Sequence, residues 1–119
     1  MKNRSAITTE PPPATTPICW QRETTTPCLR IELPNGEIHI LPYAHLVSAH
    51  FTKSKDDTET LRLIFSTHEI QIEGHDLRDL LLGIQDFAIK WLRPVPERYV
   101  EIASTKAGII TKICVSVAE

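Results

Sequence analysis

The stretch LRIELPNGEIHILP, residues 29–42, decides the fold class because apolar and polar side chains alternate on both sides of an Asn-Gly pair. Alternation with a period of two is typical of a β-strand with one buried face, and Asn-Gly is favoured in two-residue hairpin turns. A turn at this pair predicts one wholly apolar face. Its opposed pairs are Leu33 with Ile38, Ile31 with Ile40 and Leu29 with Pro42. We expect Arg30, Glu32 and His39 to share the other face.

A second stretch of the same design, LRLIFSTHEIQIEG at residues 61–74, predicts a second hairpin. A turn at Thr67-His68 again leaves one face apolar. The opposed pairs are then Phe65 with Ile70, Leu63 with Ile72 and Leu61 with Gly74. Arg62 faces Glu73 on the outside. Two such hairpins indicate an antiparallel sheet with one buried side.

The segment after the first hairpin predicts a turn and a third strand. Pro42 lacks an amide hydrogen, so residues 42–46 predict a turn or a single helical turn. A strand follows at residues 47–51, and the polar residues 52–60 predict a long solvent-exposed loop. The side chains expected to point inward are Val47, Ala49 and Phe51, with Ser48 and His50 outside.

A helix is predicted to begin at Asp76, because aspartate is favoured at helix N-caps. Its apolar side chains keep helical spacing: Leu77, Leu80, Leu81, Ile84, Ala88 and Trp91. The end of this segment also alternates, so residues 86–92 predict either more helix or a separate strand. A last strand is expected at residues 109–117, which are rich in β-branched side chains.

The chain of 119 residues divides by composition into an arm and a domain. Residues 1–28 are rich in threonine and proline and predict a flexible N-terminal arm. Residues 29–119 predict a single α+β domain. We expect a mainly antiparallel sheet of about six or seven strands, with the Asp76 helix packed on its apolar face.

Composition also limits where the protein acts. No apolar run approaches the roughly 20 residues that cross a bilayer, and the N-terminus lacks the apolar segment of a secretory signal. We therefore expect a soluble, cytoplasmic protein without a membrane partner. Three cysteines are an odd number, which indicates reduced thiols rather than a disulfide framework.

The five histidines raise the question of a metal site. His39, His45 and His50 fall within one short stretch, but the sequence does not place them together, and only Glu32 offers a partner to the ring of His39. We expect surface histidines, no metal and no cofactor.

The segment Glu73, Gly74, His75, Asp76 is the candidate for catalysis, because a histidine between two carboxylates can act as a general base. The same residues also suit a strand-to-helix turn, in which the glycine bends the chain and Asp76 caps the helix. The sequence holds no serine nucleophile elbow and no glycine-rich phosphate loop. We therefore favour a non-enzymatic protein.

The net charge of −2 and the small number of free aromatic side chains disfavour nucleic-acid binding. We expect a protein-interaction or regulatory module that self-associates through a sheet edge formed by residues 109–117. Its candidate contact residues are Trp20, Tyr43 and Tyr99. The alternatives are a small enzyme or metal-dependent binding protein that uses the histidines above, and a weak nucleic-acid binder.

Overall fold

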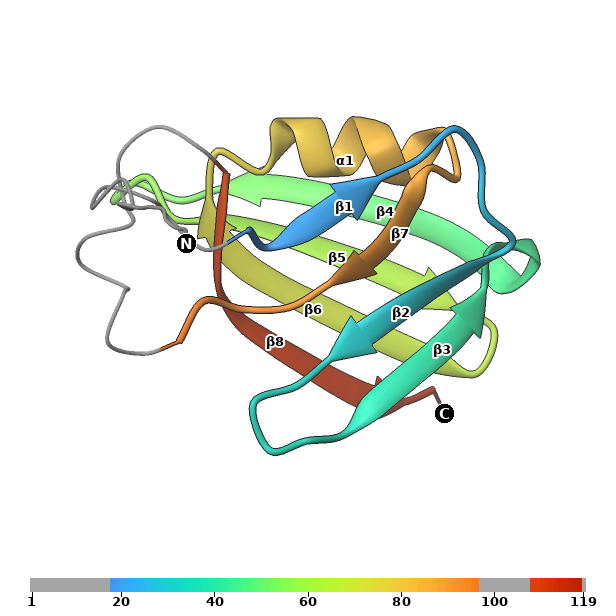
Figure 1. Cartoon of the computed structure of the whole chain (residues 1–119). Helices are drawn as coiled ribbons and strands as arrows, with labels where there is room; N and C mark the ends of the chain where they lie inside the picture. Colours follow the sequence, from blue (N-terminus) through green and yellow to red (C-terminus); the bar gives the residue numbers. More distant parts are fainter. Residues whose placement is uncertain (1–17, 97–107, 119) are drawn as a thin grey trace, which may run out of the picture.

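The computed structural model describes residues 18–96 and 108–118, which form two four-stranded sheets facing one another (Figure 1). Sheet A has the order β1 (Trp20–Arg22), β7 (Ile89–Leu92), β2 (Cys28–Glu32) and β3 (Ile38–Pro42). Sheet B has the order β4 (Leu46–Lys53), β5 (Glu59–Phe65), β6 (His68–His75) and β8 (Ile109–Val117). Strands β2 and β7 are parallel, and the other neighbours are antiparallel.

The α+β class and the mainly antiparallel pairing are confirmed, but a single sheet covered by a helix is wrong. The two hairpins belong to different sheets, and their apolar faces are buried mainly against each other, with the helix only at one side of this core. The side chains that fill this core include Leu29 and Ile31 from sheet A with Leu61, Leu63, Ile70 and Ile72 from sheet B.

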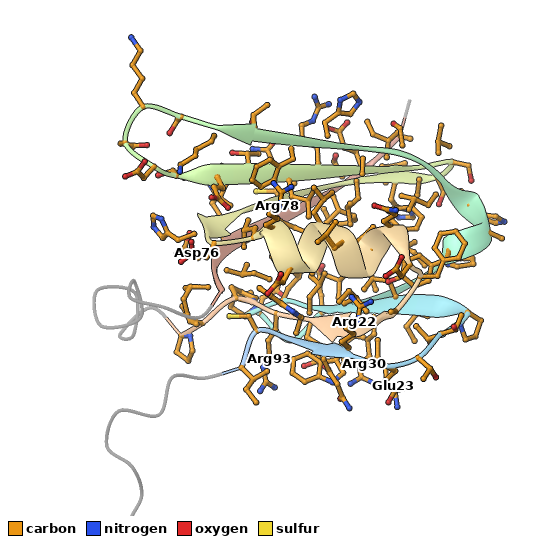
Figure 2. The ribbon with its side chains drawn as sticks, turned by 90° about the horizontal axis from the view of Figure 1, so that it is seen from above. Arg22, Glu23, Arg30, Asp76, Arg78 and Arg93 are labelled. Carbon is orange, nitrogen blue, oxygen red and sulfur yellow. The ribbon has the colours of Figure 1, made fainter. Side chains whose placement is uncertain are left out.

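Helix α1 (Arg78–Gln85) closes one open side between the sheets, next to β1 and β4 (Figures 1 and 2). Leu80 and Ile84 are buried, as the helical spacing predicts. No helix in residues 18–96 and 108–118 is long and apolar enough to cross a membrane.

The register predicted for the first hairpin is wrong by one residue. The Leu33 carbonyl accepts a hydrogen bond from the Gly36 amide, and the Leu33 amide donates to the Glu37 carbonyl. The turn therefore has three loop residues rather than two. Pro34 occupies the position that favours proline in a type I turn, and Gly36 follows with a φ of +95°. The extra residue exchanges the faces of β3, because side chains alternate along a strand. Glu32 is therefore paired with Ile38, which points outward.

The register of the second hairpin is shifted by two residues, so Leu63 pairs with Ile70 instead of Ile72. The loop consists of Ser66 and Thr67 rather than Thr67-His68. An even shift keeps every side chain on its face, and the predicted buried row is correct. Arg62 is paired with Gln71, not with Glu73 as expected.

The turn predicted at residues 42–46 is a 3-10 helix, Tyr43–His45. In β4 the inward position of Phe51 is confirmed, because it is paired with buried Leu61 and packs on the core. Val47 is 68% exposed, contrary to expectation, because the ladder with β5 shifts register at this residue.

The predicted helix cap is wrong, since Asp76 makes no capping hydrogen bond and has a φ of +55°. The buried carboxylate of Glu59, at the start of β5, instead accepts the Leu77 amide at 2.7 Å. The negative charge of a carboxylate at this end also interacts favourably with the positive end of the helix dipole. The cap is thus supplied from a distant strand.

The open question at residues 86–92 is settled in favour of a strand. The amides of Phe87 and Ala88 donate to Ile84 and Gly83, which is the hydrogen-bond pattern of a Schellman motif. Phe87 takes the left-handed conformation that ends the helix, with a φ of +55°. Strand β7 then begins at Ile89.

The ends of the described chain complete the two sheets. The last strand has the predicted bounds, Ile109–Val117, and lies at the edge of sheet B. Part of the arm that we expected to be flexible lies in sheet A, where β1 is paired with β7 and Cys19 is buried. The rest of that arm, residues 1–17, lies outside the described residues, as do 97–107.

Candidate protein interface

Each strand of sheet A contributes one side chain to a row across its outer face. The register pairs Gln21 of β1 with Trp91 of β7, Trp91 with Arg30 of β2, and Arg30 with Ile40 of β3. Figure 2 shows Arg30 on the side of sheet A that faces away from sheet B. The row therefore combines an aromatic, a cationic and an apolar side chain on a solvent-facing surface.

A second group of contacts holds these side chains in place. The indole Nε1 of Trp91 donates to Gln21 at 2.7 Å, and the guanidinium carbon of Arg93 lies 4.6 Å from the Trp91 ring centroid. Glu32 accepts from Arg30 Nε at 2.8 Å, and its other oxygen lies 3.8 Å from Arg93. The indole and both guanidinium groups are thus ordered before any partner arrives.

Two isoleucines extend this surface to the edge of the sheet. Ile38 is 58% exposed and Ile40 is 62% exposed, because the three-residue turn places them on the outer face. Neither is part of the core. The name sheet A face is used below for the four side chains of the row, for Ile38, and for the two charged side chains that hold the row in place. Its members are Gln21, Arg30, Glu32, Ile38, Ile40, Trp91 and Arg93.

The outer face of sheet B is different in character. Among the described residues its members are mainly polar: Ser48, His50, Thr52, Thr60, Arg62, Ile64, Glu69, Gln71, Glu73, Lys112, Cys114 and Ser116. Ile64 is half-buried, and Arg62 forms a surface ion pair with Glu69 at 2.6 Å. This face has the composition of an ordinary solvated sheet.

Each positive charge around the sheet A face has a carboxylate nearby. Arg22 lies 2.7 Å from Asp86, and Lys90 lies 3.6 Å from Glu23. The Arg30 and Arg93 side chains share Glu32, as described above. The surface is therefore of mixed charge rather than a positive patch.

A cleft of about 650 Å³ opens where the sheet A face meets the start of β8. Its walls include Leu33, Pro94 and Ile113, with Lys112 beside them. Glu32 and Arg93 line it too, but both are engaged in the contacts of the sheet A face. The cleft thus continues that face onto the edge of the sandwich.

The three histidines proposed as metal ligands occupy three different places. His39 lies on the inner face of β3, near His68 at a ring separation of 6.0 Å, and not beside Glu32 as expected. His45 is exposed in the 3-10 helix, and His50 lies on the outer face of β4. No group of three or more metal-ligating side chains occurs in the part of the chain that the structure describes.

The candidate catalytic residues are held by separate contacts. Glu73 accepts from Gln71 at 3.2 Å, and His75 Nδ1 lies 3.3 Å from the Asp57 carbonyl oxygen. Asp76 is exposed beside the start of α1 (Figure 2). These contacts add nothing to the catalytic interpretation.

The predicted contact residues are also placed by the fold. Trp20 is half-buried and packs against the core. Tyr43 is buried, donates to the Ile89 carbonyl at 2.7 Å and stacks on Phe87. Burial raises the pKa of the Tyr43 hydroxyl well above its usual range. Tyr99 lies outside the described residues.

Most of the sheet A face was not predictable from local sequence patterns. Arg30 and Glu32 lie on the outer face as expected, whereas Ile38 and Ile40 were predicted to be buried. For Trp91 the sequence predicts either the apolar row of a helix or a strand at residues 86–92, and it does not indicate the neighbours of that strand. The proline before the Asn-Gly pair was the available signal, because it favours the longer turn that turns both isoleucines outward.

Comparison with protein-family models, with curated proteins and with solved structures found no significant match.

Proposed function

We propose that this chain is a non-enzymatic protein-interaction module that binds a protein partner on the sheet A face. The observation that carries the proposal is the ordered Trp91–Arg93 pair on a solvent-facing sheet. Tryptophan and arginine are the residue types that most often dominate the energy of protein interfaces. Because Gln21 and Glu32 already hold this pair, less side-chain entropy is lost on binding.

The chemistry of the face indicates the kind of partner. Ile38 and Ile40 favour an apolar surface, and the indole offers a flat ring next to them. Arg30 and Arg93 already share a carboxylate, so a phosphate backbone would have to displace Glu32 to gain its usual contacts. A protein surface with apolar and polar groups fits better than a nucleic acid.

Site-specific photo-crosslinking in cells of the source organism tests this proposal. Lys90 is exposed on β7 next to Trp91, and Thr52 is exposed on the outer face of sheet B. We expect the Lys90→p-benzoylphenylalanine chain to form discrete adducts and the matched Thr52→p-benzoylphenylalanine chain to form none of them.

Competition makes the result specific to the sheet A face. An excess of the unmodified chain should suppress the adducts at position 90, whereas Trp91→Ala should compete about 30-fold less well, as for a typical hot-spot residue. The same adducts from positions 90 and 52, or equal competition by Trp91→Ala, would contradict the proposal.

A further inference from the structure

Strand β3 is one of the two edge strands of sheet A, and within the described residues it is paired only with β2 (Figure 1). The Leu33 amide donates to the Glu37 carbonyl, and the Tyr43 amide donates to the Pro27 carbonyl. Residues whose backbone groups bond to the partner strand alternate along an antiparallel pair. The amides and carbonyls of the odd-numbered residues of β3 therefore point toward β2. The backbone N–H and C=O groups of Ile38 and Ile40 therefore point away from the sheet.

The other sheet edges carry features that hinder pairing with another chain. Strand β1 has three residues, and β4 is interrupted at Val47 and ends in Lys53. On β8 the Ile110 carbonyl is occupied by the Val95 amide. The outward side chains of β8 are polar: Lys112, Cys114 and Ser116.

Strand β3 has a proline only at its end, Pro42, and its other two outward residues are exposed isoleucines. An exposed apolar edge of this kind is a template for pairing with another strand. The edge that we predicted for self-association, β8, is thus less suited to it than β3.

We propose that two copies of this chain associate by antiparallel pairing of their β3 strands, with Ile38 of each copy opposite Ile40 of the other. The two-fold axis then passes beside His39. Ile38 and Ile40 of each strand form hydrogen-bonded pairs with their counterparts, so each of their amides and carbonyls gains a partner.

The two neighbouring registers of the β3 pair would form fewer hydrogen bonds between the copies. Centring the pair on Ile40 places Ile38 opposite Pro42, which has no amide to donate. Centring it on Ile38 places Ile40 opposite Gly36, whose amide already donates to Leu33. The register centred on His39 is therefore the one that uses the amides and carbonyls of both Ile38 and Ile40.

The pairing has a consequence for the outer surface. A two-fold axis perpendicular to the sheet keeps the outer faces on the same side, so four isoleucines form one contiguous strip. The sheet A faces of the two copies then lie on one continuous eight-stranded sheet. This inference does not depend on the proposed partner, because it concerns the edge of the sheet and needs only the purified chain.

Sedimentation equilibrium of the full chain tests the association, and the wild type should approach twice its 13.5 kDa mass as its concentration rises through the micromolar range. Ile38→Lys/Ile40→Lys places lysine opposite lysine and should weaken association at least about tenfold. Ile38→Lys/Ile40→Glu removes the same apolar surface but places each lysine opposite a glutamate, and it should stay within about threefold of the wild type. Equal weakening by the two double variants would overturn the register, and a monomeric wild type would overturn the inference.

A disulfide provides a second readout, independent of the isoleucine variants. Opposed residues in a non-hydrogen-bonded pair have Cα atoms about 4.5 Å apart, within the disulfide range. In a Cys28→Ser/Cys114→Ser background, His39→Cys should therefore form a covalent dimer on oxidation. Ile40→Cys is the matched control, because its copy lies diagonally across the pair at roughly 7 Å or more. Dimer formation by Ile40→Cys and not by His39→Cys would contradict the proposed register. Adducts from position 90 in the photo-crosslinking experiment report on the sheet A face whether or not this dimer forms.

Discussion

The cap that β5 supplies to α1 gives a quantitative prediction for the stability of the fold. The Glu59 carboxylate accepts the Leu77 amide at 2.7 Å, and both residues are buried. Glu59→Ala removes the acceptor and leaves that amide without a partner in a place that water does not reach. Asp76, the nearest acidic residue in sequence, makes no cap in the wild type.

The expected cost follows from the charge and burial of this hydrogen bond. A buried donor left unpaired costs about 1–3 kcal/mol, and hydrogen bonds to charged groups lie toward the upper end. We expect Glu59→Ala to lower the free energy of unfolding by about 2 kcal/mol. Glu59→Gln keeps an acceptor and loses only the favourable charge at the helix start, so about 0.5–1 kcal/mol is expected.

Urea denaturation monitored by circular dichroism measures both changes, with Glu69→Ala as the matched control. Glu69 is paired with Arg62 at the surface, where such a pair contributes about 0–1 kcal/mol. If Glu59→Ala costs no more than Glu69→Ala, or if Glu59→Gln costs as much as Glu59→Ala, the capping argument is refuted.

Three further predictions concern close packing, alkaline pH and thiol access. Gly74→Ala should lower the unfolding free energy by about 2–3 kcal/mol, because its Cβ would lie 1.9 Å from the first carbonyl oxygen of β8; a neutral result in urea denaturation would refute the close approach. Burial raises the pKa of Tyr43 above its unfolded value of about 10, so stability should be intact below pH 10 and decline above it. Tyr43→Phe should lack that decline. Melting temperatures of the wild type and the variant that change equally between pH 8 and pH 11 would contradict this prediction. Maleimide should label the exposed thiol of Cys114 quickly and the buried thiol of Cys19, whose pKa burial raises, only after unfolding; equal labelling rates by mass spectrometry would contradict the described burial.

Local patterns in the sequence predict which segments are strands but not how those strands meet. The alternation in residues 61–74 survives a two-residue shift, because an even shift leaves each side chain on its face. In residues 29–42 one extra turn residue, set by Pro34, reverses the faces of β3. A small change in turn chemistry therefore decides whether Ile38 and Ile40 are core or surface.

The candidate interface was harder to predict because it is assembled from strands far apart in the chain. The row beside Trp91 requires β7 to insert between β1 and β2, and no local pattern encodes that order. The same holds for Glu59, which caps a helix that begins almost twenty residues later. The charged partners of the interface, Arg30 and Glu32, were placed correctly because they belong to a strand whose own alternation is regular.

Amide hydrogen exchange at β3, followed by nuclear magnetic resonance as the protein concentration is raised, tests most directly whether this edge of sheet A is a binding surface. The Ile38 and Ile40 amides face away from β2 in the single chain, whereas the His39 amide is bonded within the hairpin. We expect the His39 amide to be protected at every concentration, and the Ile38 and Ile40 amides to become protected together as the dimer forms. Fast exchange at Ile38 and Ile40 under conditions where sedimentation detects a dimer would contradict it.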